Sequence, residues 1–101
     1  SQVPTLVFDE VDVGIGGGTA ETVGRLMREL GHRAQIICVT HLPQVAAHGH
    51  AHYRVSRDGG TTIAQLGTKE RTTEIARMLG GKETRKSAAH AREILAAAQA
   101  S

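Results

Sequence analysis

The chain opens with two apolar runs separated by one helical pattern. Residues 3–8 form an apolar run without alternation, and this pattern predicts a strand that is buried on both faces. Residues 35–39 form a second run of the same kind. Between them, residues 20–30 predict a helix, with Thr19 placed to cap its start and Gly31 to end it. The apolar side chains expected on its inner face are Val23, Leu26, Met27 and Leu30. Strand, helix and strand in this order predict a βαβ unit with two parallel strands.

The middle of the chain predicts a short helix and a hairpin. Pro43 suits the first turn of a helix that runs to Ala47. Residues 52–56 and 61–66 are rich in strand-forming side chains. Residues 57–60, with the sequence Arg-Asp-Gly-Gly, suit a tight turn between them.

The last third of the chain predicts two helices. The first covers residues 69–79, with Thr68 as its cap, and the second covers residues 87–99. Apolar residues expected to point inward are Ile75, Met78, Leu79, Ile94 and Leu95. We therefore expect a single α/β unit: a parallel βαβ core followed by a β-hairpin and two C-terminal helices.

Composition narrows the class of protein. The 101 residues are 40% hydrophobic and 22% charged, which is typical of one small globular domain. No stretch predicts a membrane span and no leader sequence is expected. A net charge of +2 and an aromatic content of 2% argue against a basic or base-stacking nucleic-acid surface. Cys38 is the only cysteine, which excludes an internal disulfide, and its apolar neighbours favour a buried, inert thiol.

Polar side chains follow directly on both predicted parallel strands. Asp9 and Glu10 end the first strand, and Thr40 and His41 follow the second. Ligands of open α/β sheets bind beyond the carboxyl ends of their strands, so these residues are expected in one site. Asp9 suits Mg²⁺, while Glu10, on the other side of the extended chain, suits a base that polarises water. The alternative is that the two carboxylates simply end a strand in solvent.

The glycine-rich and histidine motifs do not favour a second nucleotide- or metal-binding site. The glycine-rich residues 14–18 follow a strand and precede a helix, but Thr19 stands where a dinucleotide-binding loop requires its third glycine. A phosphate-binding G-x-x-x-x-G-K-[ST] loop is absent from the sequence. A metal site at the alternating His48, His50 and His52 is a minor alternative, because no cysteine or acidic side chain lies near them in sequence.

Three segments resemble the heads of SMC-like, ABC-type ATPases, which are P-loop NTPases. Residues 6–16, Leu-Val-Phe-Asp-Glu-Val-Asp-Val-Gly-Ile-Gly, resemble the Walker B motif and the D-loop. Residues 39–46, Val-Thr-His-Leu-Pro-Gln-Val-Ala, resemble the switch-histidine segment, and residues 74–81 resemble the C-terminal end of such a head. The resemblance extends over about residues 5 to 97 and is strongest to bacterial members that act in DNA repair.

This resemblance implies a role for each motif. Asp9 would support Mg²⁺ and Glu10 would activate the hydrolytic water. His41 would sense the γ-phosphate of ATP. The D-loop, with Asp12, Gly14 and Gly16 as its nucleotide-site residues, would cross the interface of a head-to-head homodimer. The complete assembly would hold DNA ends during double-strand-break repair and recombination, in the bacterial cytoplasm at the nucleoid.

The sequence also departs from the family pattern. Many ABC-type ATPases have an aspartate where this chain has Gly16, so contacts of that carboxylate do not carry over. Walker A, the glutamine loop, the signature motif and a coiled coil are absent from residues 1–101. We therefore expect one partial domain, the C-terminal part of a head, which has no ATP turnover by itself. The alternatives are a non-enzymatic α/β dimerisation or interaction module, another SMC- or ABC-type head fragment, or a small nucleotide- or metal-binding domain.

Overall fold

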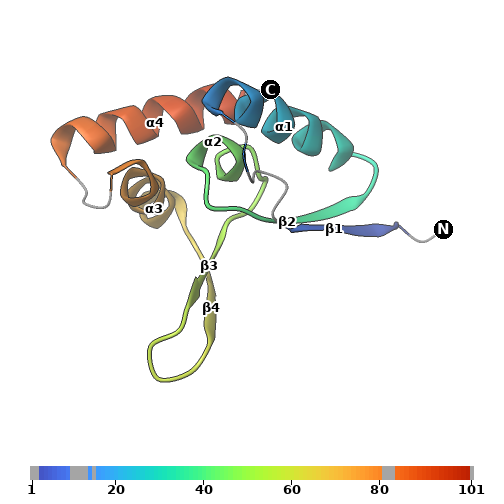
Figure 1. The fold of residues 1–101 in the computed structure, drawn as a ribbon, viewed down its shortest axis with the longest axis horizontal. Coiled ribbons are helices and arrows are strands. Elements are labelled where there is room, and N and C mark those ends of the chain that lie inside the picture. Colours follow the sequence, from blue (N-terminus) through green and yellow to red (C-terminus); the bar gives the residue numbers. More distant parts are fainter. Residues whose placement is uncertain (1–2, 10–13, 15, 81–83, 101) are drawn as a thin grey trace.

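The computed structural model describes residues 3–9, 14, 16–80 and 84–100. Its elements follow the expected order of a βαβ unit, a hairpin and two C-terminal helices (Figure 1). They are β1 (Thr5–Asp9), α1 (Gly17–Leu30), β2 (Gln35–Val39), α2 (Pro43–Ala46), β3 (Tyr53–Ser56), β4 (Thr62–Gln65), α3 (Thr68–Gly80) and α4 (Arg85–Gln99). No helix in this described part of the chain is both long enough and apolar enough to span a membrane.

Strands β1 and β2 pair in parallel, which confirms the predicted βαβ unit. Their register sets Thr5 beside Gln35 and Asp9 beside Val39. The expected burial of both faces is wrong for the described residues, since Val7 is 65% exposed and Ile37 is 46% exposed. The helices pack mainly on one another, α1 on α2 and α3 on α4, so they leave this two-stranded sheet largely uncovered.

Helix α1 approaches α2 most closely at small residues, while two of its four predicted inner side chains are exposed. Ala20 is fully buried, and a Cβ atom placed on Gly24 would lie only 2.9 Å from the carbonyl oxygen of Gln44. Leu26 and Leu30, expected to point inward, are 54% and 43% exposed. The close approach of the two backbones explains the difference, because a large side chain does not fit between them.

The N-terminal ends of three helices differ from the prediction. Helix α1 begins at Gly17 with Gly16 as its N-cap, so Thr19 lies inside the helix and does not cap it. Helix α3 includes Thr68, which was expected to be its cap. Helix α4 begins at Arg85, two residues earlier than expected, because Thr84 and Ser87 form a reciprocal capping box.

The hydrophobic core lies between α2, α3 and α4. Ile75 is its only large side chain that is fully buried in the described part of the chain. The remaining buried residues of the core are Ala47, Ala76, Ala91 and Ala98. Met78, Leu79, Ile94 and Leu95 pack against them, which confirms the inward faces predicted for the last two helices.

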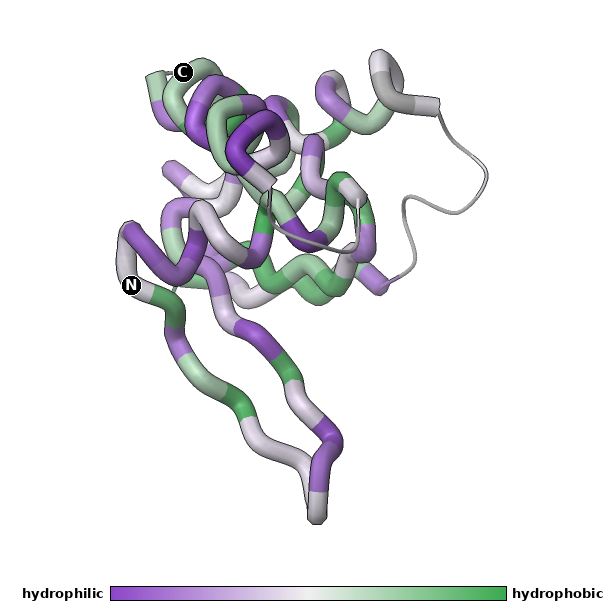
Figure 2. The backbone as a smooth tube through the Cα atoms, turned by 90° about the vertical axis from the view of Figure 1, so that its left-hand side faces the viewer, coloured by the Kyte–Doolittle hydropathy of each residue, from purple (hydrophilic) through white to green (hydrophobic). Residues whose placement is uncertain are grey.

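The hairpin β3–β4 projects away from the helices (Figures 1 and 2). Its antiparallel register pairs Val55 with Ile63. Gly59 and Gly60 have φ angles of 67° and 122°, a backbone region that favours glycine, as the Asp-Gly-Gly sequence predicted. Both apolar side chains of the central pair remain more than half exposed, at 53% for Val55 and 65% for Ile63.

Candidate functional site

The parallel pairing brings the ends of β1 and β2 to one edge of the sheet. Asp9 is the last residue of β1 and lies beside Val39, the last residue of β2. Thr40 and His41 follow at once, and both Asp9 and His41 are exposed to solvent. The prediction that the two strand ends share one edge is therefore confirmed. A carboxylate and an imidazole accessible at the same edge can act on a ligand that binds there.

A fixed turn connects the end of β2 to helix α2. The Leu42 N–H donates a 3.0 Å hydrogen bond to Thr40 Oγ1. Leu42 has the extended backbone that a following proline favours, and Pro43 is the first residue of α2. The carbonyl of Leu42 accepts from the N–H groups of Val45 and Ala46. His41 is thus tied on its C-terminal side to the start of a regular helix.

The glycine-rich segment leads into the N-terminus of α1. Gly14 has a φ of 79°, in the left-handed region. Gly16 is the N-cap of α1, and its carbonyl accepts a 2.9 Å hydrogen bond from the Ala20 N–H. Glu10 and Asp12, the other two predicted site residues, lie outside the described residues.

The three alternating histidines do not form a metal site. His48 is buried, and its Nδ1 lies 2.7 Å from the carbonyl oxygen of Gln44. His50 packs edge-to-face on His32, with ring centroids 5.4 Å apart. The segment bends after α2 and is not extended, so His48, His50 and His52 have different surroundings. Among the described residues, no group of three His, Cys, Asp or Glu side chains can hold a metal ion.

An arginine that the sequence did not single out binds the backbone after α2. Arg71 extends from α3, and its Nη2 donates to the carbonyls of Ala46, Ala47 and Gly49. The three distances are 3.0, 3.2 and 2.6 Å. We call residues 46–49 the 46–49 turn. Carbonyl groups at the end of a helix lack hydrogen-bond donors within the helix. Here a charged side chain supplies those donors.

Two further helices reach the same turn. The Gln99 amide at the end of α4 donates to the carbonyls of Ala47 and Gly49, at 2.8 and 2.9 Å. Arg28 of α1 donates to the carbonyl of His48 at 2.9 Å and to Gln99 Oε1 at 3.2 Å. Side chains from α1, α3 and α4 thus meet at one short turn. No local sequence pattern signals these contacts, because the partners are 20 to 71 residues apart.

Burial and neighbouring charge change the protonation of the groups near this turn. Burial, with a contribution from the charge of Arg28, lowers the pKa of Arg71. Burial and the charge of Arg71 also lower the pKa of His52, although Glu74 acts in the opposite direction. The hydrogen bonds from Arg77 to Glu74, at 2.8 and 2.6 Å, lower the pKa of that carboxyl. His52 is therefore favoured in its neutral form.

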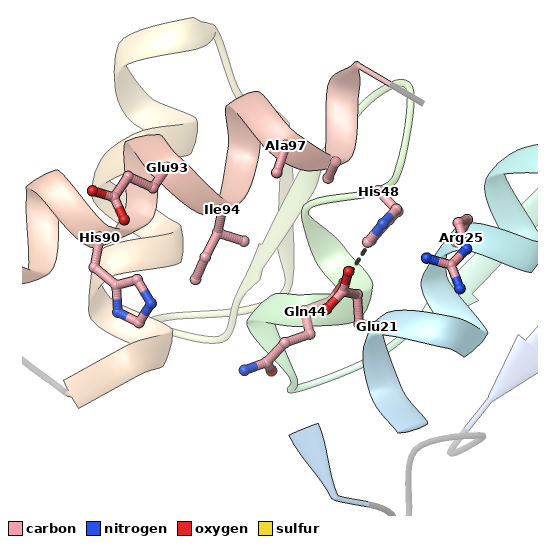
Figure 3. A pocket seen from close by; sticks show the side chains of 9 residues that line it. Glu21, Arg25, Gln44, His48, His90, Glu93, Ile94 and Ala97 are labelled. Atoms are coloured by element: carbon pink, nitrogen blue, oxygen red, sulfur yellow. Dashed lines mark hydrogen bonds between the residues drawn. The ribbon is translucent and has the colours of Figure 1, made fainter. Parts of the chain in front are cut away.

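A cleft of about 320 Å³ lies between α1 and α4, and Gln44 of α2 also lines it (Figure 3). Glu21 and Arg25 line it from α1, while His90 and Glu93 line it from α4 (Figure 3). The cleft does not include Asp9 or His41. It is therefore separate from the sheet edge that carries the predicted chemistry.

Comparison with known proteins supports the family resemblance. No family model matches the chain. The DNA repair protein RecN of Xylella fastidiosa is 59% identical over 91 residues, which cover 85% of this chain. RecN of Haemophilus influenzae is 50% identical over 101 residues, and RecN of Mycobacterium tuberculosis is 46% identical over 99, each covering 94% of this chain. Most of this chain is thus similar to one segment of these RecN proteins.

The chain spans only 16% to 18% of the length of these relatives. A solved structure from work on ATP-driven dimerisation and DNA-stimulated activation of SMC ATPases has a TM-score of 0.67 to it. The match covers 83% of this chain and 52% of the solved chain, at 24% sequence identity. This likeness confirms the predicted α/β fold, which matches the fold of part of that SMC ATPase structure.

The lowered pKa of His52 predicts a pH-dependent stability. Because the folded chain holds the proton less tightly than the unfolded chain, the free energy of unfolding should fall as pH drops below the ordinary histidine value of 6.5. His50 should add to this effect, since burial and the charges of Arg28, His32 and Arg71 lower its pKa too. Urea denaturation at pH 7.5 and 5.5 measures the change. His52→Asn should make stability less dependent on pH, and an unchanged dependence would contradict the assignment.

Proposed function

We propose that this chain is the C-terminal part of the ATP-binding and ATP-hydrolysing head of a RecN-like DNA repair protein. The observation that carries the proposal is the 59% identity to RecN, together with the placement of Asp9 and His41 at one sheet edge. On this proposal, residues 1–101 form one partial domain. It supplies the Walker B residues, the D-loop and the switch histidine, and the rest of the protein supplies the loop that binds the phosphates.

The proposed cofactors are Mg²⁺ and ATP. Asp9 fits Mg²⁺, because its carboxylate is exposed at the end of a strand and Mg²⁺ binds one or two carboxylates together with substrate phosphates. Mg²⁺ would neutralise charge on the phosphates during hydrolysis. Glu10 accepts a proton from the attacking water, and His41 donates a hydrogen bond to the γ-phosphate.

The proposed partners are the rest of the same protein and a second head. The exposed apolar side chains of β1 and β2 support the proposal that another part of the same head covers this sheet. Monomeric proteins rarely leave such apolar surfaces exposed to solvent. Asp12, Gly14 and Gly16 lie in the segment assigned to the interface between two heads. DNA ends are held by the complete dimer, which acts in the cytoplasm at the nucleoid.

The oligomeric state tests this proposal. The full-length protein that carries this segment should double in mass, measured by light scattering, when MgATP is added. The 101-residue chain by itself should show no ATP turnover under the same conditions. Association that needs no ATP, in a full-length protein that does not hydrolyse it, would contradict the proposal and favour an interaction module.

A further inference from the structure

The 46–49 turn accepts hydrogen bonds from side chains of three other helices. Four successive carbonyl groups, those of residues 46–49, each accept at least one hydrogen bond from a side chain of another helix. A turn of this kind at a protein surface is ordinarily satisfied by water. Here Arg71, Gln99 and Arg28 replace that water.

Helix α2 connects this turn to His41. Pro43–Ala46 is a single helical turn, so the 46–49 turn and His41 lie at its opposite ends. The backbone between them has few free torsions, since Leu42 bonds to Thr40 and Pro43 has a fixed φ. Movement at one end of α2 is therefore transmitted to the other.

The middle of α2 is held from a second side. Gly24 of α1 lets the two backbones meet, and its hypothetical Cβ would lie 2.7 Å from His48 Nδ1. His48 in turn is bonded through that Nδ1 to the carbonyl of Gln44, as Figure 3 shows. Lateral packing and the contacts at the turn together restrain the position of α2.

We propose that Arg71, assisted by Gln99 and Arg28, is a positioning residue that sets His41 at the nucleotide through α2. The inference rests on the proposed function, because it takes His41 to act on the γ-phosphate. On this inference, the two C-terminal helices determine the placement of the switch histidine. Arg71 leads because a single nitrogen of its side chain contacts three of the four carbonyls.

Arginine suits this task for a physical reason. Its guanidinium stays charged when partly buried and presents its donors in one rigid plane. A lysine ammonium can reach the same carbonyls as a point charge, but with less directional control. Arg71→Lys should therefore retain part of the function that Arg71→Ala loses.

The test uses ATP hydrolysis by the full-length protein. Arg71→Ala should lower kcat about tenfold, since small displacements of a catalytic group are costly, and should change KM for ATP much less. Arg71→Lys should recover part of this loss. Arg92→Ala, an exposed arginine on α4, is the matched control and should retain wild-type kcat.

A double-mutant cycle separates positioning from general destabilisation. If Arg71 acts through His41, Arg71→Ala should have little further effect on kcat when His41 is already alanine. Additive losses in the two variants would overturn the inference, and so would wild-type kcat in Arg71→Ala. An inactive wild-type protein would instead contradict the proposed function, so the two failures are distinguishable.

Discussion

Changing Glu10 to glutamine in the full-length protein should stop multiple turnover of ATP and leave a nucleotide-bound dimer. Glutamine has nearly the same shape as glutamate but does not accept a proton from water at neutral pH. Loss of a general base lowers a rate by about 10²- to 10⁴-fold. Asp9 remains to support Mg²⁺, so ATP binding and head association should persist. Steady-state ATP hydrolysis and light scattering in MgATP measure the two effects.

Glu29→Gln is the matched control for this change. Glu29 is exposed near the end of α1, so the same chemical substitution there should leave turnover unchanged. Normal multiple turnover of ATP by the Glu10→Gln variant would contradict the role assigned to Glu10. Loss of turnover without an ATP-dependent dimer would also count against it, since the variant is expected to remain in the bound state.

Gly24→Ala should destabilise the chain, although alanine ordinarily favours a helix over glycine. The added Cβ would lie 2.7 Å from His48 Nδ1 and 2.9 Å from the Gln44 carbonyl oxygen, and the latter is backbone that moves only if α2 moves. Overpacking of this kind costs about 1 to 3 kcal/mol. All but the lowest part of this range exceeds the gain in helix propensity, which is about 1 kcal/mol. Chemical denaturation, followed by circular dichroism, measures the free energy of unfolding.

Gly18→Ala in the same helix is the control for Gly24→Ala. A Cβ atom at Gly18 would meet no atom of the described residues within 4 Å, so only the change in helix propensity should remain. The free energy of unfolding should rise by up to about 1 kcal/mol. Equal stabilisation of the chain by both substitutions would contradict the close packing of α1 on α2 at Gly24.

Local patterns predicted most of the elements because the forces that form them are local. Strand β2 occupies residues 35–39 as expected, and the Asp-Gly-Gly turn forms where its glycines allow it. The common edge of Asp9 and His41 also followed from the sequence, because parallel pairing of consecutive strands is a strong topological rule. Helix starts were less accurate, since a backbone N-cap such as Gly16 leaves no clear side-chain signal.

Packing between helices could not be predicted in the same way. The apolar stripe of α1 favoured Leu26 and Leu30 as inner residues, but the contact forms at Ala20 and Gly24, where the backbones approach. The contacts of Arg71 and Gln99 with the 46–49 turn join residues 22 to 52 positions apart. The exposure of β1 and β2 was also not predicted. An apolar run indicates that a strand is buried, but it does not indicate which other part of the protein covers it.

The two-stranded sheet has a practical consequence for anyone who purifies this segment. Among the described elements, β1 and β2 are both edge strands, and the outer side of each pairs with no other described strand and lies next to exposed apolar side chains. Such edges template the addition of further strands from other molecules. At the concentrations used for crystallisation or NMR, aggregation through this sheet should limit the sample. A charged or proline substitution on the outer side of an edge strand is the natural remedy.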